Sequence, residues 1–169
     1  MDRHRKMQLL ELADLVQTER ANMLRYAYYR IGNAEDARDI LQDVYLSVHT
    51  RIEEGKNIKV LNLKNYLFCT LANNCADYLL NRSKHKTVNI DTESDVEDLP
   101  PDYTEEDYAR VSKVLATLPE EQAEIIRLHI YAAKTFVDVA AILELPLSTV
   151  KSRFIYGLRK LRKQLTLDH

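Results

Sequence analysis

The sequence predicts an all-α protein made of two small helical domains that are joined by a flexible acidic linker. Three observations support this fold class. Only three of the 169 residues are glycine, the apolar residues recur every three or four positions rather than in alternation, and the charge changes abruptly along the chain. A chain of this length suffices for one ordinary domain or two small ones.

Charge divides the chain into three segments. Residues 1–88 carry a net charge of +3, residues 89–109 contain nine acids and no base, and residues 110–169 carry +4. The middle segment contains Pro100 and Pro101 and few large apolar residues, so it cannot bury enough surface to order itself. We therefore expect domains at 1–88 and 110–169 with a linker at 89–109. Solubility alone is the simplest explanation of the linker's charge.

The first domain contains three helical patterns. The first runs from about Gln8 to Ile31, and the third from about Leu63 to Arg82. Between them Asn33 is a candidate N-cap for a second helix, whose core stripe is Ala37, Leu41, Val44 and Val48. On another face of this helix Asp39 and Asp43 lie one turn apart, with Asp36 close to their line.

The second domain begins with a helical pattern at about 108–117. A second helix is expected from the proline and acids at 119–121, which favour a helix start, to about Tyr131. Thr135 is the expected N-cap of a third helix. After a break at 144–147, Ser148 is the expected N-cap of a last helix, whose core stripe is Val150, Phe154, Leu158, Leu161 and Leu165.

The last helix carries six bases and no acid between Lys151 and Lys163. A short helix, a tight turn and a second helix with a basic face form the plan of a helix-turn-helix. Its first turns offer short hydroxyls and donors for base edges, and its later bases suit phosphates. The first group is Ser148, Thr149, Lys151, Ser152 and Arg153, and the second is Arg159, Lys160, Arg162 and Lys163. A solvated basic face is the alternative interpretation.

Several classes of protein are not favoured. Cys69 and Cys75 lie six residues apart in one helical pattern, so no disulfide is expected between them, and two free thiols suit a reducing cytoplasm. The sequence shows no apolar run long enough to cross a bilayer and no secretion signal. We find no metal-ligand spacing, cofactor motif or catalytic motif, so we expect neither a metal, nor a cofactor, nor an enzyme.

Three stretches of the chain resemble bacterial sigma factors of RNA polymerase. Residues 135–163, which end in LPLSTVKSRFIYGLRKLRK, resemble their fourth conserved region. GNAEDARDILQDVY at 32–45 and YLFCTLANNCADYLLNR at 66–82 resemble their second region. The order of the two regions, with a short linker between them, is similar to the extracytoplasmic-function group of the sigma-70 family.

The resemblance implies an alternative sigma factor that binds core RNA polymerase, recognises the −35 and −10 promoter elements and assists melting. It implies core binding at the β′ clamp helices through Asp36, Asp39, Gln42 and Asp43. It implies contacts to the −10 element through Tyr66, Asn73, Asn74, Asp77, Tyr78, Arg82 and Lys84. Contacts to the −35 element would come from Ser148, Thr149, Lys151, Ser152, Arg153, Tyr156, Arg159 and Lys160.

The resemblance also implies further partners and roles. Another surface of the last domain would bind the β flap, an anti-sigma factor would bind the chain, and the acidic linker would thread the channel that nascent RNA later occupies. Against the family's pattern, Tyr66 replaces a tryptophan, Glu144 a glycine and Tyr156 an arginine. Residues 69, 72 and 80 lack the bases that are frequent there. A sigma-like protein that only titrates an anti-sigma factor, and a plain helix-turn-helix regulator, are the alternatives.

Overall fold

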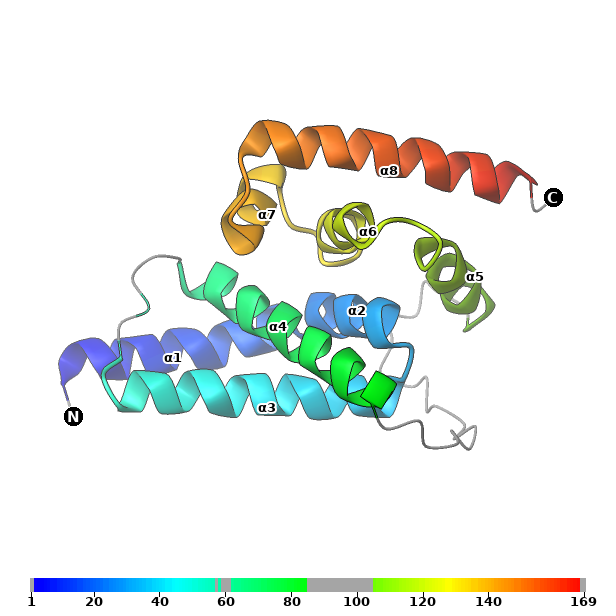
Figure 1. The fold of residues 1–169 in the computed structure, drawn as a ribbon. Coiled ribbons are helices and arrows are strands. Elements are labelled where there is room, and N and C mark those ends of the chain that lie inside the picture. The colour runs from blue at the N-terminus through cyan, green and yellow to red at the C-terminus, as the bar shows by residue number, and fades with distance from the viewer. Residues whose placement is uncertain (1, 57, 59–61, 85–104, 168–169) are drawn as a thin grey trace.

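The protein is described by a computed structural model that covers residues 2–56, 58, 62–84 and 105–167. Every regular element in these residues is helical, which confirms the all-α prediction. The helices form two layers in Figure 1: helices α1 to α4 make the lower layer, and α5 to α8 lie across it. We call these layers the N-terminal and C-terminal lobes.

The first predicted helix is in fact two helices. α1 (Arg3–Thr18) starts earlier than expected, because the Asp2 carboxylate caps it by accepting a hydrogen bond from the His4 amide at 3.2 Å. The chain bends at Glu19 (φ −99°, ψ 0°) and continues as α2 (Arg20–Ile31). The bend was missed because its partner is distant in sequence: the Glu19 carboxylate accepts a hydrogen bond from Lys134 at 2.8 Å.

α3 (Ala34–Glu53) follows as predicted. Gly32 ends α2 in the left-handed conformation (φ 76°), and the Asn33 side chain accepts a hydrogen bond from the Asp36 amide at 3.0 Å. The predicted core stripe is confirmed, since all of its members are buried: Ala37, Leu41, Val44 and Val48.

α4 (Leu63–Lys84) starts at the predicted residue and ends two residues after Arg82. Leu67, Phe68, Leu71 and Cys75 are fully buried among α2, α3 and the C-terminal lobe. Figure 1 shows α4 on the side of the lower layer that faces α6 and α7. This helix of the N-terminal lobe therefore forms part of the interface with the C-terminal lobe.

The C-terminal lobe begins with α5 (Glu105–Leu115), so that 105–109, which were expected in the linker, are helical. Residues 89–104 of the predicted linker lie outside the described residues. α6 (Glu120–Ile126) starts after Pro119 as expected and continues into a π-helical turn, η2 (Arg127–Tyr131). In η2 the Ala132 amide donates to the Arg127 carbonyl, five residues earlier, at 2.9 Å.

The predicted helix-turn-helix consists of α7 (Phe136–Leu143) and α8 (Leu147–Leu167). Thr135 caps α7 as expected, accepting a hydrogen bond from the Asp138 amide at 3.1 Å. The prediction that Ser148 caps α8 is wrong. The helix starts two residues earlier than this cap would imply, at Leu147, because the Pro146 carbonyl already accepts a hydrogen bond from the Val150 amide at 3.1 Å, and Ser148 therefore lies in the first turn.

The two lobes share their apolar cores. Leu67 and Phe68 of α4 belong to one buried cluster with Leu128, Ile142 and Val150 of the C-terminal lobe. A second cluster joins α2 to α5, α6 and α8, and includes a stacked pair, Tyr29 and Tyr131, whose ring centroids are 3.9 Å apart. The predicted stripe of α8 faces these clusters, with Val150 and Leu161 buried and Phe154, Leu158 and Leu165 half-buried.

Candidate nucleic-acid interface

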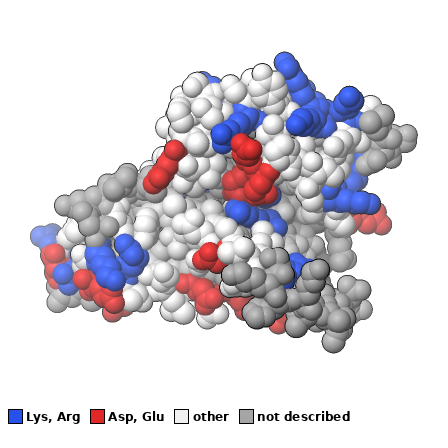
Figure 2. Space-filling model, viewed as in Figure 1, with Lys and Arg blue, Asp and Glu red and all other residues white. Residues whose placement is uncertain are grey.

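The outer face of α8 presents most of the residues predicted to contact the −35 element. Ser148, Lys151, Ser152, Tyr156, Arg159 and Lys160 are all exposed. Each residue turns a helix by about 100°, so five of these positions fall on the half of α8 opposite its apolar stripe, whereas Lys151 lies beside the stripe, seven residues before Leu158. Figure 2 shows basic side chains gathered over the upper part of the molecule, where α8 lies in Figure 1.

Two predicted −35 residues lie at the edge of this face. Thr149 is half-buried. Arg153 is also half-buried and points toward α6, where its guanidinium lies 3.6 Å from the Glu121 carboxylate. Arg153 lines a cleft between the lobes, and Asn73 of α4 lines the same cleft. In this arrangement Arg153 is therefore not part of the outer face with Lys151.

The residues predicted to contact the −10 element lie along α4. Asn73, Asp77 and Arg82 are exposed and Asn74 is half-buried. Lys84 is the last residue of the helix, and its side chain is outside the described part of the chain. Tyr66 is half-buried against the core of the N-terminal lobe, with the Arg51 guanidinium 5.9 Å from its ring centroid.

Tyr78 joins two of the predicted sites. Its hydroxyl donates a hydrogen bond to the Asp36 carboxylate at 2.5 Å. Burial and this hydrogen bond raise the pKa of Tyr78 to about 12. Asp36, predicted to bind core polymerase, is thus already engaged by a residue predicted to contact DNA. The other three residues of that site, Asp39, Gln42 and Asp43, are exposed on α3. We call these three the α3 ridge.

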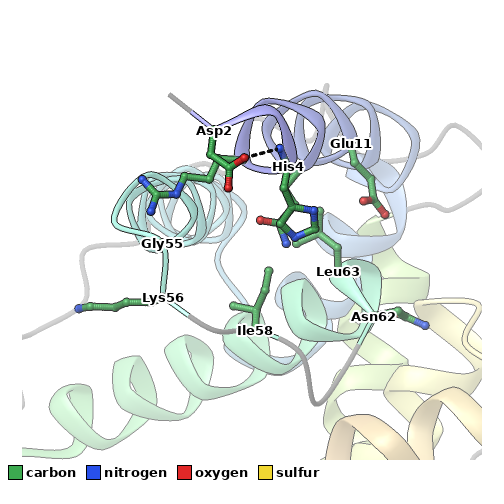
Figure 3. Close-up of a pocket in the computed structure, with 10 residues that line it drawn as sticks. Asp2, His4, Glu11, Gly55, Lys56, Ile58, Asn62 and Leu63 are labelled. Carbon is green, nitrogen blue, oxygen red and sulfur yellow. Dashed lines mark hydrogen bonds between the residues drawn. The ribbon is translucent and has the colours of Figure 1, made fainter.

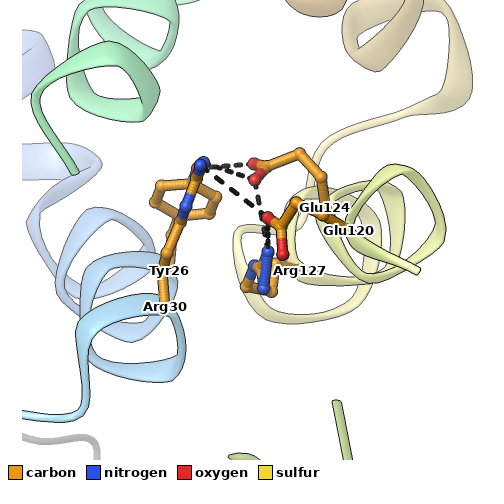
Figure 4. Close-up of polar contacts among 5 residues, drawn as sticks. All are labelled: Tyr26, Arg30, Glu120, Glu124 and Arg127. Atoms are coloured by element: carbon orange, nitrogen blue, oxygen red, sulfur yellow. Dashed lines mark hydrogen bonds and ion pairs between the residues drawn. The ribbon is translucent and has the colours of Figure 1, made fainter. Parts of the chain in front are cut away.

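A buried polar cluster that the sequence did not predict joins the lobes (Figure 4). Glu124 of α6 is at its centre, and we call it the Glu124 cluster. The Glu124 carboxylate accepts hydrogen bonds from the Tyr26 hydroxyl and from Arg30, both at 2.5 Å. Arg30 also donates to the Tyr26 oxygen at 2.7 Å. Arg127 lies 3.5 Å from Glu124 and pairs with Glu120.

The electrostatics of the Glu124 cluster are coupled. Tyr26 is fully buried, and burial together with the Glu124 carboxylate raises its pKa well above the usual value. Burial alone would lower the pKa of Arg30, but the nearby Tyr26 and Glu124 outweigh it and raise that pKa. The buried charge of Arg30 is therefore neutralised by Glu124 of the opposite lobe, whereas Arg127 is paired within its own lobe.

Lys134, between η2 and α7, makes a second polar contact, which we call the Lys134 anchor. Its side chain is only 3% exposed and lies between Glu19, at 2.8 Å, and the Phe68 ring, whose centroid is 4.3 Å away. Burial raises the pKa of Glu19, but hydrogen bonds from Lys134 and Asn22 outweigh it and lower that pKa. Nearby, Asn65 and Lys64 of α4 contact Asp138 of α7 at 3.2 and 3.7 Å.

The sequence held a weak signal for these contacts. Glu120, Glu124 and Arg127 recur at four and three residues, and Tyr26 and Arg30 lie four apart. Such spacing places each group on one helix face. The pattern does not reveal that the two faces meet.

One cavity lies away from all predicted site residues. It has a volume of about 600 Å³ and lies between the start of α1, the end of α3 and the start of α4 (Figure 3). Its charged lining includes Asp2, Arg5, Glu11 and Lys56. Among the described residues no cluster of His, Cys, Asp and Glu is suited to a metal ion. No helix in the described ranges is long and apolar enough to span a membrane.

Two family models match this chain in the order that the fold presents. Sigma-70 region 2 matches residues 12–85, which include the end of α1 and all of α2 to α4, and sigma-70 region 4 matches residues 114–163, which include α6, α7 and most of α8. The chain belongs to the sigma-70 family. Sigma factors are transcription initiation factors, and this one is a member of the extracytoplasmic-function group.

Individual proteins are similar over nearly the whole chain. The "ECF RNA polymerase sigma factor SigW" of Bacillus subtilis is 24% identical over 164 residues, which are 90% of this chain and 88% of that protein. The fold resembles the sigma factor RpoE in complex with the anti-sigma factor NepR from Bartonella quintana (TM-score 0.67, 24% identity, 95% of this chain and 97% of that one). It also resembles CnrH in complex with the cytosolic domain of CnrY (TM-score 0.74, 20% identity, 99% of both chains).

Proposed function

We propose that this sigma factor binds core RNA polymerase and directs it to promoters, with α8 reading the −35 element and α4 the −10 element. The exposed face of α8 is the observation that carries the proposal. It combines hydroxyls, amines and a guanidinium on the second helix of a helix-turn-helix. Residues 1–88 and 110–169 would act as the two functional domains, joined by 89–109.

The first turns of α8 suit the major groove. Recognition helices place their N-terminal residues at base edges and their later residues beside phosphates. Ser148, Lys151, Ser152 and Tyr156 would therefore contact bases, and Arg159 and Lys160 would contact phosphates. Thr149 and Arg153, which are half-buried at the edge of this face, would add to the base contacts.

α4 offers groups that capture unpaired bases. Melting exposes base edges and faces, which proteins hold by hydrogen bonds and by stacking on aromatic rings. Asn73, Asn74 and Asp77 supply hydrogen-bonding groups, while Tyr66 and Tyr78 supply rings. Because the Tyr78 hydroxyl is bonded to Asp36, this residue would contribute its ring rather than its hydroxyl. Arg82 and Lys84 would contact the backbone.

The α3 ridge would bind the clamp helices of the polymerase β′ subunit. Its exposed carboxylates suit a basic partner, because charge complementarity guides association and fixes register. Asp36 would support this surface from its bond to Tyr78. Binding of core to α3 and of DNA to α4 would then be mechanically linked through one hydrogen bond.

Run-off transcription with purified core polymerase tests the proposed function. Genomic fragments that bind the reconstituted holoenzyme are first recovered and sequenced, and then serve as templates. We expect specific transcripts that require this protein, and Lys151→Ala should reduce their yield. A wild-type chain that binds core polymerase but supports no transcript from any recovered fragment would contradict the proposal.

A charge reversal tests the α3 ridge separately. Asp39→Lys with Asp43→Lys should abolish association with core polymerase, measured by gel filtration, and leave helicity unchanged. The control is Glu11→Lys with Asp14→Lys, a pair of exposed acids on α1 with the same change in charge. Equal losses in both double variants would indicate a nonspecific effect of net charge.

An interaction with an anti-sigma factor is a second candidate function. Both solved structures described above are complexes with a partner, and in one of them the sigma factor RpoE is bound to an anti-sigma factor. A chain that only titrates such a factor would bind it yet give no transcript in the assay above. The intact basic face of α8 favours transcription over titration alone.

A further inference from the structure

Ile155 places a large aliphatic side chain among the polar groups on the outer face of α8. It is 49% exposed, and Tyr156 beside it is 58% exposed. The neighbouring apolar residues that do face the core, Phe154 and Leu158, are half-buried and pack against the apolar clusters. Packing of α8 on its own lobe therefore does not explain an isoleucine at this position.

Ile155 lies beside the residues that would contact bases. It follows Lys151 by four residues and Ser152 by three, and residues at these spacings are neighbours on a helix surface. Helical side chains point back toward the N-terminus, so the side chain of Ile155 covers the turn that contains Lys151 and Ser152. Single exposed apolar residues are common on protein surfaces. The location of Ile155 within the reading face, rather than its exposure, therefore carries the inference.

The side chains around Ile155 recognise bases by hydrogen bonds. Ser148 and Ser152 offer hydroxyls and Lys151 offers an amine, which pair with the donors and acceptors of base edges. Thymine also presents a C5-methyl group in the major groove, and proteins recognise this group by apolar contact. An isoleucine that covers the methyl group removes apolar surface of both partners from water, which favours binding.

We propose that Ile155 is a specificity-determining residue of this sigma factor and contacts the C5-methyl group of a thymine in the −35 element. The inference rests on the proposed function, because it needs α8 in the major groove of that element. The hydrogen-bonding side chains would set the register of α8, and Ile155 would favour thymine at one position. Burying one methyl group is worth about a fourfold change in affinity, which is the size of the preference expected.

Replacing single thymines by deoxyuridine tests this contact. Deoxyuridine pairs with adenine in the same way as thymidine and lacks only the methyl group. The reconstituted holoenzyme is titrated with a promoter duplex recovered from genomic fragments, and each thymine of the −35 element, on either strand, is replaced in turn. The wild-type holoenzyme should lose affinity about fourfold at one position and keep its affinity at the others.

The protein variant is Ile155→Ala in the full chain. Because the side chain is exposed, helicity and thermal unfolding should not change. The variant should bind the thymine duplex at least about fourfold more weakly than wild type, and deoxyuridine at the sensitive position should then cause no further loss. Such non-additivity is the signature of a direct contact. The matched control is Leu10→Ala, which removes the same number of carbon atoms from an exposed residue of α1 and should reproduce the wild-type losses.

Two results would overturn the proposal. In the first, the −35 element contains no thymine, or the wild-type holoenzyme tolerates deoxyuridine at every one of its thymines. In the second, Ile155→Ala loses as much affinity as wild type when the sensitive thymine is replaced, which would assign the methyl group to another residue. Both leave the proposed function intact if the wild-type holoenzyme binds a duplex with a scrambled −35 element more weakly. Equal binding to the scrambled duplex would instead contradict the reading of this element by α8, and this inference with it.

Discussion

At the scale of single residues, the two ends of the α8 basic face should behave differently. Lys151 lies in the second turn, where recognition helices meet base edges, and Lys163 lies three turns later. Lys151→Ala should cost about 1–3 kcal/mol on the preferred upstream element and relax its sequence preference. Lys163→Ala should weaken binding equally on all sequences and lower the salt slope by about one unit.

Binding of the holoenzyme to promoter variants across a salt series measures both effects. Glu106→Ala, an exposed acid of α5, is the control. If both lysine variants lose affinity equally on all sequences, α8 attracts DNA only by its charge and does not recognise a sequence.

Glu144 has a backbone conformation that is unfavourable for a residue with a side chain. It ends α7 in the left-handed conformation (φ 55°, ψ 47°), where an L side chain costs roughly 1 kcal/mol and glycine costs little. Glu144→Gly should therefore raise the free energy of unfolding by about 0.5–1 kcal/mol, measured by urea denaturation. Ala141→Gly, inside the same helix, should lower it by about 1 kcal/mol. A loss from both would mean that the Glu144 side chain itself stabilises the turn.

The sequence predicted single residues well where the cause is local. Asn33 and Thr135 cap their helices as expected, because a cap is decided within four residues. The bend at Glu19 and the inward turn of Arg153 depend on Lys134 and Glu121, which come from other elements. No pattern along the chain carries that information.

At the scale of elements, α6 and α8 approach each other closely at Gly157. A Cβ at this buried position would lie 3.0 Å from Ile126 Cδ1 and 3.1 Å from Gln122 Cβ. Gly157→Val should therefore push α8 away from α6 and cost about 1–3 kcal/mol. At Gly32 an added Cβ meets nothing within 4 Å, so Gly32→Ala should cost only the roughly 1 kcal/mol of its positive φ.

Thermal unfolding of the two glycine variants measures this difference. Gly157→Val should also reduce binding to the −35 element, since α8 carries the reading face, whereas Gly32→Ala should not. If Gly157→Val is as stable as the wild type and binds the −35 element equally well, then α8 can shift on α6 without loss of stability or binding.

Apolar periodicity predicted the helices because it records which face is buried. The stripes of α3 and α8 lie inward as expected. A predicted helix boundary was wrong where the hydrogen bond that sets it does not follow from the apolar pattern. α8 starts at Leu147 because the Pro146 carbonyl accepts a hydrogen bond from the Val150 amide. The predicted −10 residues do share α4, but the sequence did not show that Tyr78 is bonded to Asp36.

At the scale of the whole molecule, the closure of the two lobes could not be predicted. Charge segments suggested two separate domains, and they contain no information on whether the domains touch. Tyr26 and Glu124, which lie 98 positions apart, are hydrogen-bonded across the lobes. A contact of that sequence separation is fixed by the packed structure and has no local signature.

Acid should loosen this closure through Glu19. Its carboxyl pKa is lowered in the folded chain, so its contribution to stability is complete above the usual value of about 4.3 and is lost as pH falls through the lowered one. The melting temperature of the wild type should fall between roughly pH 5 and pH 3. Glu19→Gln should show a shallower fall, whatever its stability at neutral pH. An identical slope would assign the acid sensitivity to other carboxyls.

The π-helical turn η2 has a consequence for insertions and deletions. It spans one residue more than an ordinary turn, and this surplus sets the rotation at which the chain leaves α6 and delivers Lys134 to Glu19. Deleting Ile130, whose side chain is exposed, would restore a regular helix and rotate all that follows by about 100°. Lys134 would then miss both Glu19 and Phe68. The contact between the lobes at Lys134 thus depends partly on a residue count, and a single lost codon would separate Lys134 from Glu19 while leaving both side chains in the sequence.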